Sequence, residues 1–237
     1  MSAAPRPPAQ PAGLLRRYLA WSLDMVLPAV AALALCGARI ADGLQRAAAA
    51  LDAIARSLMQ ATTDMLVHGG TPLAVARDWL ADPARREAIA ALSDAVAAVV
   101  IAPLLLASLL ALLWFAAFEA SPRQATPGKR ALGLRVEDAR GARIGFARAA
   151  LRHLAGALSW LTLNLGHLLA ALPPAHRALH DRIAGTRVLQ DPARGSRLPA
   201  WSLAWLGLQV LLATVAAAGL FLATQAAVQR AFDAMLA

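Results

Sequence analysis

The stretch that decides the fold is residues 95–118, which read AVAAVVIAPLLLASLLALLWFAAF and carry no charge over 24 residues. A helix needs about 20 apolar residues to cross the roughly 30 Å of hydrocarbon in a bilayer. A second uncharged run, residues 198–229, is 32 residues long. Residues 19–37 form a third run, broken only by Asp24, and residues 154–174 form a fourth. We therefore expect an integral membrane protein that crosses the bilayer several times.

The composition of the whole chain agrees with a membrane class. Of the 237 residues, 59% are hydrophobic and 16% are charged, whereas a soluble domain has about 45–50% apolar and about 25% charged residues. The net charge of +9 is also typical of nucleic-acid-binding proteins. Here the charges lie in loops beside apolar runs, so we predict the lipid bilayer as partner and no nucleic acid. The single cysteine, Cys36, excludes an internal disulfide.

The loop charges predict which side each loop occupies. Residues 1–18 carry three Arg and no acid, and residues 37–94 carry six Arg against seven acids, a net −1. Residues 119–152 carry eight basic against three acidic residues, a net +5, and residues 173–199 carry five Arg against two Asp, a net +3. Positively charged loops stay cytoplasmic. We expect a bacterial-type inner membrane protein with a cytoplasmic N-terminus and the 37–94 segment outside.

The first helix is predicted from about Leu14 to Ile40. Arg16 and Arg17 before an apolar stretch are also typical of a cleaved export signal. Asp24 inside the stretch and the lack of a small-residue cleavage site favour an uncleaved helix instead.

The outer segment has its own helical pattern. Apolar residues recur at helical spacing from Leu44 to Met65, and Gly69-Gly70 ends that helix. Thr71 before Pro72, and an Asp-Pro pair at 82–83, are typical of an N-cap followed by proline at the first helical position. We predict an amphipathic helical hairpin on the outer side.

The basic loop after residue 118 changes to a strand pattern. Leu132, Leu134 and Val136 alternate with polar residues or glycine, and residues 143–146 are predicted to return as a second strand. Residues 186–189 form a third candidate strand. Open sheet edges do not survive in lipid, so we expect one small cytoplasmic β-sheet.

That sheet bears on residues 150–174. If both strand regions lie on one side, this run must enter the bilayer and return, with a break at residues 164–166. The alternative is a single crossing, which would leave five Arg outside; we favour the re-entrant segment.

The fold class is then mainly α, a transmembrane helical bundle with a small cytoplasmic sheet. The predicted parts are a disordered cytoplasmic tail (1–13), a membrane domain (14–190) with spans at 19–40 and 95–118, an outer insert (42–94), and a C-terminal part (191–237) with a span at 201–224.

Asp24 is the most informative single residue, because an acid inside a spanning helix costs several kcal/mol and is rarely without a role. Arg17 lies seven residues before it, on the same helix face and about 10 Å away along the axis. Both side chains are expected to point to one interior. A structural ion pair of Asp24 with Arg130, Arg135 or Arg182 is at least as well supported as a transport role.

Other candidate sites are weaker. His176 and His180 have the four-residue spacing of zinc ligands on a helix, but the glutamate of the metalloprotease motif is absent. Residues 126–129, Thr-Pro-Gly-Lys, fit a tight turn better than a phosphate loop. We predict no metal, no cofactor, no catalytic residue and no enzymatic activity.

Three blocks of the chain resemble the RDD-domain family of multi-pass membrane proteins. They are residues 17–24 (RYLAWSLD), residues 126–136 (TPGKRALGLRV) and residues 177–188 (RALHDRIAGTRV), in the family's order. The resemblance implies a charged triad of Arg17, Asp24 and Asp181. It also implies supporting motif residues, namely Gly128, Lys129, Arg135, His180, Arg182, Gly185 and Thr186.

The resemblance implies two kinds of function. Some members of the family are assigned cation/proton antiport, which predicts a transport component that uses intramembrane acids. Others resemble assembly modules of larger membrane complexes, which predicts a membrane-protein partner or a homo-oligomer. The long 42–94 insert and the added C-terminal span depart from the family pattern and favour the second kind.

Overall fold

The computed structural model describes residues 9–195 and 197–236, which are mainly helical with one small sheet. The chain forms two compact units, Met1–Ala31 with Leu106–Gln209 and Ala32–Leu105 with Val210–Ala237. Three short η segments are Ala97–Ile101, Leu169–Ala171 and Pro192–Arg194. The strands are β1 (Gln10–Pro11), β2 (Leu134–Asp138) and β3 (Thr186–Gln190), and the helices are α1 (Leu14–His68), α2 (Pro72–Ala81), α3 (Pro83–Val96), α4 (Ala102–Glu119), α5 (Pro127–Ala131), α6 (Phe146–Leu161), α7 (Leu165–Leu168), α8 (Leu179–Ile183) and α9 (Ala200–Leu236).

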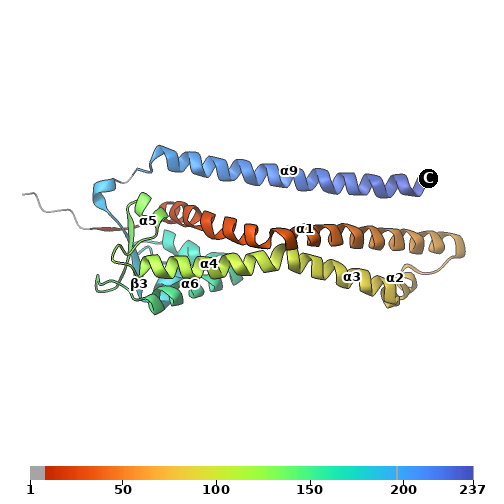
Figure 1. The fold of residues 1–237 in the computed structure, drawn as a ribbon, viewed down its shortest axis with the longest axis horizontal. Helices are drawn as coiled ribbons and strands as arrows, with labels where there is room; N and C mark the ends of the chain where they lie inside the picture. Colours follow the sequence, from red (N-terminus) through yellow and green to blue (C-terminus); the bar gives the residue numbers. More distant parts are fainter. Residues whose placement is uncertain (1–8, 196, 237) are drawn as a thin grey trace, which may run out of the picture. The chain divides into compact units, whose positions relative to one another are not determined.

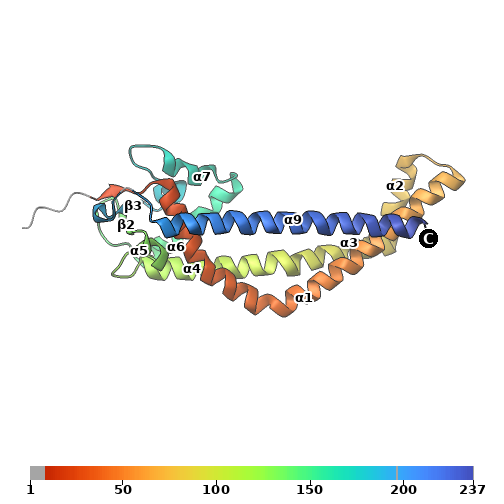
Figure 2. The same cartoon turned by 90° about the horizontal axis from the view of Figure 1, so that it is seen from above.

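The sheet belongs to the first unit and has the order β1-β3-β2. β2 and β3 are antiparallel with Val136 opposite Val188, and Figure 2 shows the three strands side by side, with β1 in red. The predicted small sheet is confirmed, although one of its strands is not the one expected. Gln10 and Pro11, expected in a disordered tail, pair instead with the end of β3. Residues 1–8 of that predicted tail lie outside the described residues.

The strand predicted at residues 143–146 is wrong. The backbone N–H of Asp138 donates to the carbonyl of Ala142 at 2.9 Å, and its carboxylate accepts from the N–H groups of Arg140 and Ala142, each at 2.8 Å. These bonds close a tight loop at the end of β2, so the chain does not return as a paired strand. Phe146 then begins α6.

The core of the first unit lies where helices meet the sheet. Leu19 and Ala20 of α1 and Val136 and Val188 of the sheet are buried in one apolar cluster with Leu132. β3 and α6 lie beside the C-terminal end of α4 (Figure 1). The start of α1 therefore packs against the face of the sheet that carries Val136 and Val188.

The predicted re-entrant segment is a bent helix pair. Phe146–Leu161 and Leu165–Ala171 meet at 117°. The break falls at Leu163 and Asn164, which have positive φ of 51° and 66°, and asparagine tolerates this left-handed region better than most residues. The break was predicted at 164–166. The helix begins at Phe146, ahead of the predicted start at residue 150.

The second unit contains the insert. α1 continues to His68 rather than ending near Ile40 as predicted, because residues 41–68 lack proline and are rich in alanine, the best helix former. Gly43 lies against α3 and the segment after it, since a Cβ there would be 2.7 Å from Cγ2 of Val99. Thr71 and Asp82 cap α2 and α3 with their side chains, as predicted.

Three helical stretches are long and apolar enough to cross a membrane. They are Leu14–His68, Pro83–Glu119 and Ala200–Ala226, and the bent pair would be a fourth if it crosses as one span. The predicted spans at 19–40, 95–118 and 201–224 fall within these three stretches.

Candidate functional site: a buried ion network

Asp181 of α8 is fully buried, and donors occupy both of its carboxylate oxygens. Oδ2 accepts from Nη1 and Nη2 of Arg17 at 2.7 and 2.8 Å and from the N–H of Ala178 at 3.0 Å. Oδ1 accepts from Nε of Arg152 at 3.0 Å. Hydrogen bonds between ionised groups are about twice as strong as neutral ones. Asp181 therefore connects α1, α6 and α8.

Arg152 joins this carboxylate to a second one. Its Nη1 donates to Oε1 and Oε2 of Glu119 at 2.7 and 2.9 Å. Nζ of Lys129 donates to the same Oε1 at 2.8 Å and lies 4.6 Å from the centre of the Phe115 ring. We call these five charged residues the ion network: Arg17, Lys129, Arg152, Glu119 and Asp181.

Local sequence explains why two of these residues point inward. Arg152 shares a buried stripe of α6 with Ala149, Ala155 and Ser159, at three- and four-residue spacing. Glu119 is the last residue of α4, directly after the uncharged run, and is 0% exposed. Both are therefore placed in the interior by the faces of the helices that carry them.

The surroundings set the charge of the α8 residues. Burial raises the pKa of Asp181, but the charges of Arg152 and Arg17 outweigh it and hold that pKa well below its usual range. Burial, and after it the charge of Arg152, lower the pKa of His180 to about 3. His180 is therefore neutral at pH 7. Because Arg152 has only donors, Nε2 of His180, 3.3 Å from its Nη2, must be the acceptor.

Asp24 has a separate environment in the same unit. It is 3% exposed, its Oδ2 accepts from the hydroxyl of Thr126, and its Oδ1 accepts from the N–H of Gly128 at 2.7 Å. The Thr126 hydroxyl also accepts from the N–H of Lys129 at 3.4 Å, as the N-cap of α5. Asp24 thus attaches α1 to the start of α5.

The ion pair expected for Asp24 is not formed. Among the described residues, no Arg or Lys lies within salt-bridge distance of its carboxylate. Arg135 pairs with Glu137 instead, and Arg182 donates to the carbonyl of Arg177. Arg130 is exposed. The physical reason is that α5 already supplies Asp24 with neutral donors.

The predicted triad is therefore two sites. Arg17 and Asp181 are in direct contact, while Asp24 binds the turn at Thr126–Gly128. Lys129 connects the two regions, because its N–H bonds to Thr126 and its side chain to Glu119.

The other motif residues have local roles. Gly185 has a φ of +63°, which turns the chain from α8 into β3, and Thr186 begins that strand, with its carbonyl accepting from Nε of Arg177 at 3.0 Å. Arg135 lies on the exposed face of the sheet, and Arg182 is exposed on α8.

Sequence reasoning missed Glu119 and Arg152, which it counted only as loop charges. Each lies at an end of an uncharged run, Glu119 just after 95–118 and Arg152 just before 154–174. A charge directly beside a spanning segment is the signal that could have found them. Within the described residues, no group of three or more His, Cys, Asp and Glu side chains is arranged to hold a metal ion.

The chain was compared with models of known protein families. The family model of the RDD family matches residues 11–185, well over half of the chain. The chain belongs to the RDD family. Of the ion network, the three RDD blocks supply Arg17, Lys129 and Asp181, while Glu119 and Arg152 lie between the blocks. No curated protein and no solved structure matches the chain.

Proposed function

We propose that this RDD protein is a non-catalytic assembly module of a larger complex in a bacterial-type inner membrane. Its N-terminus and sheet would be cytoplasmic. The excess of arginine in residues 1–18, 119–152 and 173–199 supports that orientation. The apolar stretches support membrane insertion.

The observation that carries the proposal is the complete engagement of the network carboxylates. Both oxygens of Asp181 and both oxygens of Glu119 accept from cationic side chains, and both carboxylates are 0% exposed. An exchanging carboxylate needs room for an ion or proton to replace a partner. Removing one partner from a buried pair costs about 3–5 kcal/mol, so this arrangement favours a fixed structural connection over ion exchange.

Two apolar surfaces are available for a membrane partner. The most hydrophobic 18-residue stretch of α9 contains no buried residue. Near the end of α1, Leu66 and Val67 are 77% and 69% exposed, and Leu73 of α2 is 80% exposed. Large exposed apolar surfaces mark protein or membrane contacts. Both surfaces lie in the parts of the chain that depart from the family pattern.

Assembly is tested by the mass of the full-length protein extracted in mild detergent. We expect particles heavier than one chain, and we expect Leu211→Gln with Val215→Gln, one turn apart on exposed α9, to reduce them to monomers. Leu154→Gln with Leu158→Gln, two exposed leucines at the same spacing on α6 and outside both proposed surfaces, is the matched control. Monomeric wild-type protein in detergent and in native-membrane particles would contradict the assembly proposal.

A second candidate function, cation/proton transport, rests on Asp24. It is the buried carboxylate that has only neutral donors among the described residues, Thr126 and Gly128. An acid in an apolar helix commonly marks an ion pathway. Ion flux in proteoliposomes separates the two functions. Flux in wild type that a well-folded Asp24→Asn variant loses supports transport; no flux in either, or equal flux in both, eliminates it.

A further inference from the structure

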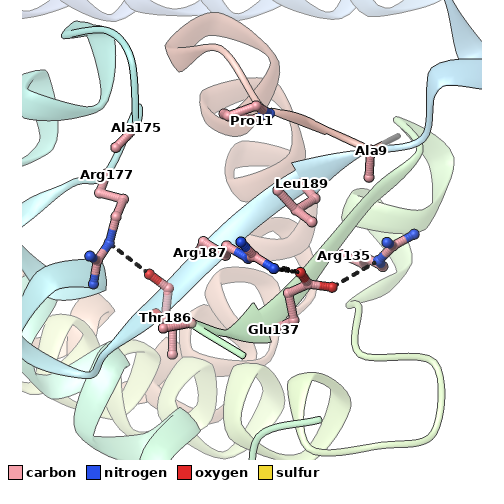
Figure 3. Close-up of a pocket in the computed structure, with 10 residues that line it drawn as sticks. Ala9, Pro11, Arg135, Glu137, Ala175, Arg177, Thr186, Arg187 and Leu189 are labelled. Carbon is pink, nitrogen blue, oxygen red and sulfur yellow. Dashed lines mark hydrogen bonds and ion pairs between the residues drawn. The ribbon is translucent and has the colours of Figure 1, made fainter. Parts of the chain in front are cut away.

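The face of the sheet that points away from the apolar core carries a hollow of about 530 Å³, and the polar part of its lining is mainly arginine. Arg135, Arg177 and Arg187 surround it, together with Glu137 (Figure 3). All of its lining residues belong to the first unit. This face is on the opposite side of the strands from the buried Val136 and Val188 and has no part in the ion network.

Strand register brings these groups together. Arg135 lies opposite Leu189 and Glu137 opposite Arg187 in the β2–β3 ladder. Because side chains alternate along a strand, all four project from the same face. Arg177 approaches from the segment before α8, where its Nε donates to the carbonyl of Thr186 at 3.0 Å and its Nη2 to that of Asp181 at 3.0 Å.

Glu137 positions two of the guanidinium groups without using all of their donors. It accepts from Nε and Nη2 of Arg187 at 2.8 and 2.7 Å and from Nε of Arg135 at 3.4 Å. Both Nη atoms of Arg135, Nη1 of Arg187 and Nη1 of Arg177 have no acceptor among the described residues. The side chains of Arg135 and Arg187 are 45% and 42% exposed, so these nitrogens are accessible.

The hollow therefore has three positive charges and one negative charge. Its lining also includes the apolar residues Pro11, Ala175 and Leu189. Planar guanidinium groups with spare N–H donors match the oxygens of a phosphate, which can accept from several arginines at once. We propose that this hollow binds a phosphate group, from a soluble phosphate compound or from an anionic lipid headgroup.

The test uses the full-length protein, delipidated in neutral detergent. Inorganic phosphate is titrated by calorimetry, and phosphatidylglycerol adducts are counted by native mass spectrometry with phosphatidylcholine as the reference lipid. Arg135→Gln removes two spare donors at the cost of one long internal bond, so the fold should tolerate it. We expect it to weaken binding roughly tenfold or more, as expected for lost hydrogen bonds to a charged group.

Two further variants make the test specific. Arg143→Gln removes the same charge from an exposed arginine outside the hollow and should leave binding unchanged. Glu137→Gln keeps one acceptor oxygen for Arg135 and Arg187 but removes the negative charge that repels a phosphate, and it should tighten binding.

Each outcome decides the proposal. Binding of inorganic phosphate that Arg135→Gln weakens supports a soluble ligand, and selective lipid adducts lost in the same variant support a headgroup. If neither probe binds, or if Arg143→Gln weakens binding as much as Arg135→Gln, no specific phosphate site exists on this face.

Discussion

The N–H of Gly128 donates to Oδ1 of Asp24 at 2.7 Å, and a Cβ on residue 128 would lie 2.8 Å from Oδ2 of the same carboxylate. That Cβ would also lie 2.4 Å from the carbonyl oxygen of Ala20, a backbone atom of α1. A flexible side chain could rotate away from such a contact, but a helix carbonyl cannot. The approach of α5 to α1 thus requires glycine for space rather than for backbone conformation.

Replacing Gly128 with alanine should separate α5 from α1. We expect Gly128→Ala to lower the free energy of unfolding by about 1–3 kcal/mol, the usual cost of overpacking a core. Gly156→Ala is the matched control, because a Cβ at residue 156 of α6 meets nothing within 4 Å. The apparent Tm in detergent measures both variants. Equal Tm values for the two variants would contradict the close packing.

Neutralising Asp181 should destabilise the protein strongly. Asp181→Asn leaves the Arg17 and Arg152 charges without their shared counter-charge in a buried site, and the expected loss is about 3–5 kcal/mol. Asp42→Asn, which removes an exposed partner of Arg46 on α1, should change stability by less than about 1 kcal/mol. Urea-dependent unfolding in mixed micelles gives both values. A small effect at residue 181 would mean that the network contributes little to the fold.

The protein should become less stable as the pH is lowered, because of His180. Its pKa in the folded protein is lowered to about 3, while an unfolded histidine titrates near 6.5. Between these values the unfolded chain binds a proton that the folded chain does not, so stability decreases as pH drops through this window. The slope from one such group is at most about 1.4 kcal/mol per pH unit.

His180→Gln should therefore flatten the dependence of unfolding free energy on pH between 6.5 and 4.5. The groups around this ring are Arg152, Asp181 and His167. Asp181, whose pKa is lowered, contributes stability that persists above about pH 4 and is lost only at lower pH. His68→Gln, at the exposed end of α1, should keep the wild-type slope. An unchanged slope for His180→Gln would contradict its burial as a neutral ring.

Cysteine labelling tests the predicted topology of the bent pair. The pairing of β2 and β3 places residues 139 and 193 on the same side of the membrane. If that side is cytoplasmic, as proposed, a cysteine at Ala139 or Ala193 in a Cys36→Ser background should react only after the membrane is permeabilised. A cysteine at Gly70 should react from outside without permeabilisation. Outside labelling at residue 193 alone would show that residues 146–171 cross the membrane once.

Sequence patterns predicted the local elements well. Alternation of apolar residues located β2, and the Gly69-Gly70 pair located the end of α1. These features depend on neighbouring residues, so periodicity and turn chemistry are sufficient to find them. The RDD blocks were equally visible, because each is a short continuous motif.

Contacts between distant residues could not be predicted in the same way. The expected partner of Asp24 was an arginine, yet Thr126 and Gly128 bind it, because the position of α5 is set by tertiary packing. The pairing of Gln10 with Gln190 joins residues that flank the two ends of the family match, residues 11–185. No local pattern marks a two-residue strand whose partner is so remote in sequence.

The pairing of Arg17 with Asp181 has a consequence for biosynthesis. A ribosome delivers Arg17 first, and 164 residues separate it from its partner. Until Asp181 is synthesised, Arg17 and Arg152 lack this counter-charge, and β1 has no strand with which to pair. Contacts of such long range form late in folding. The nascent chain can therefore complete this region only after α8 and β3 have been synthesised, and a product truncated before α8 would leave Arg17 without its carboxylate partner.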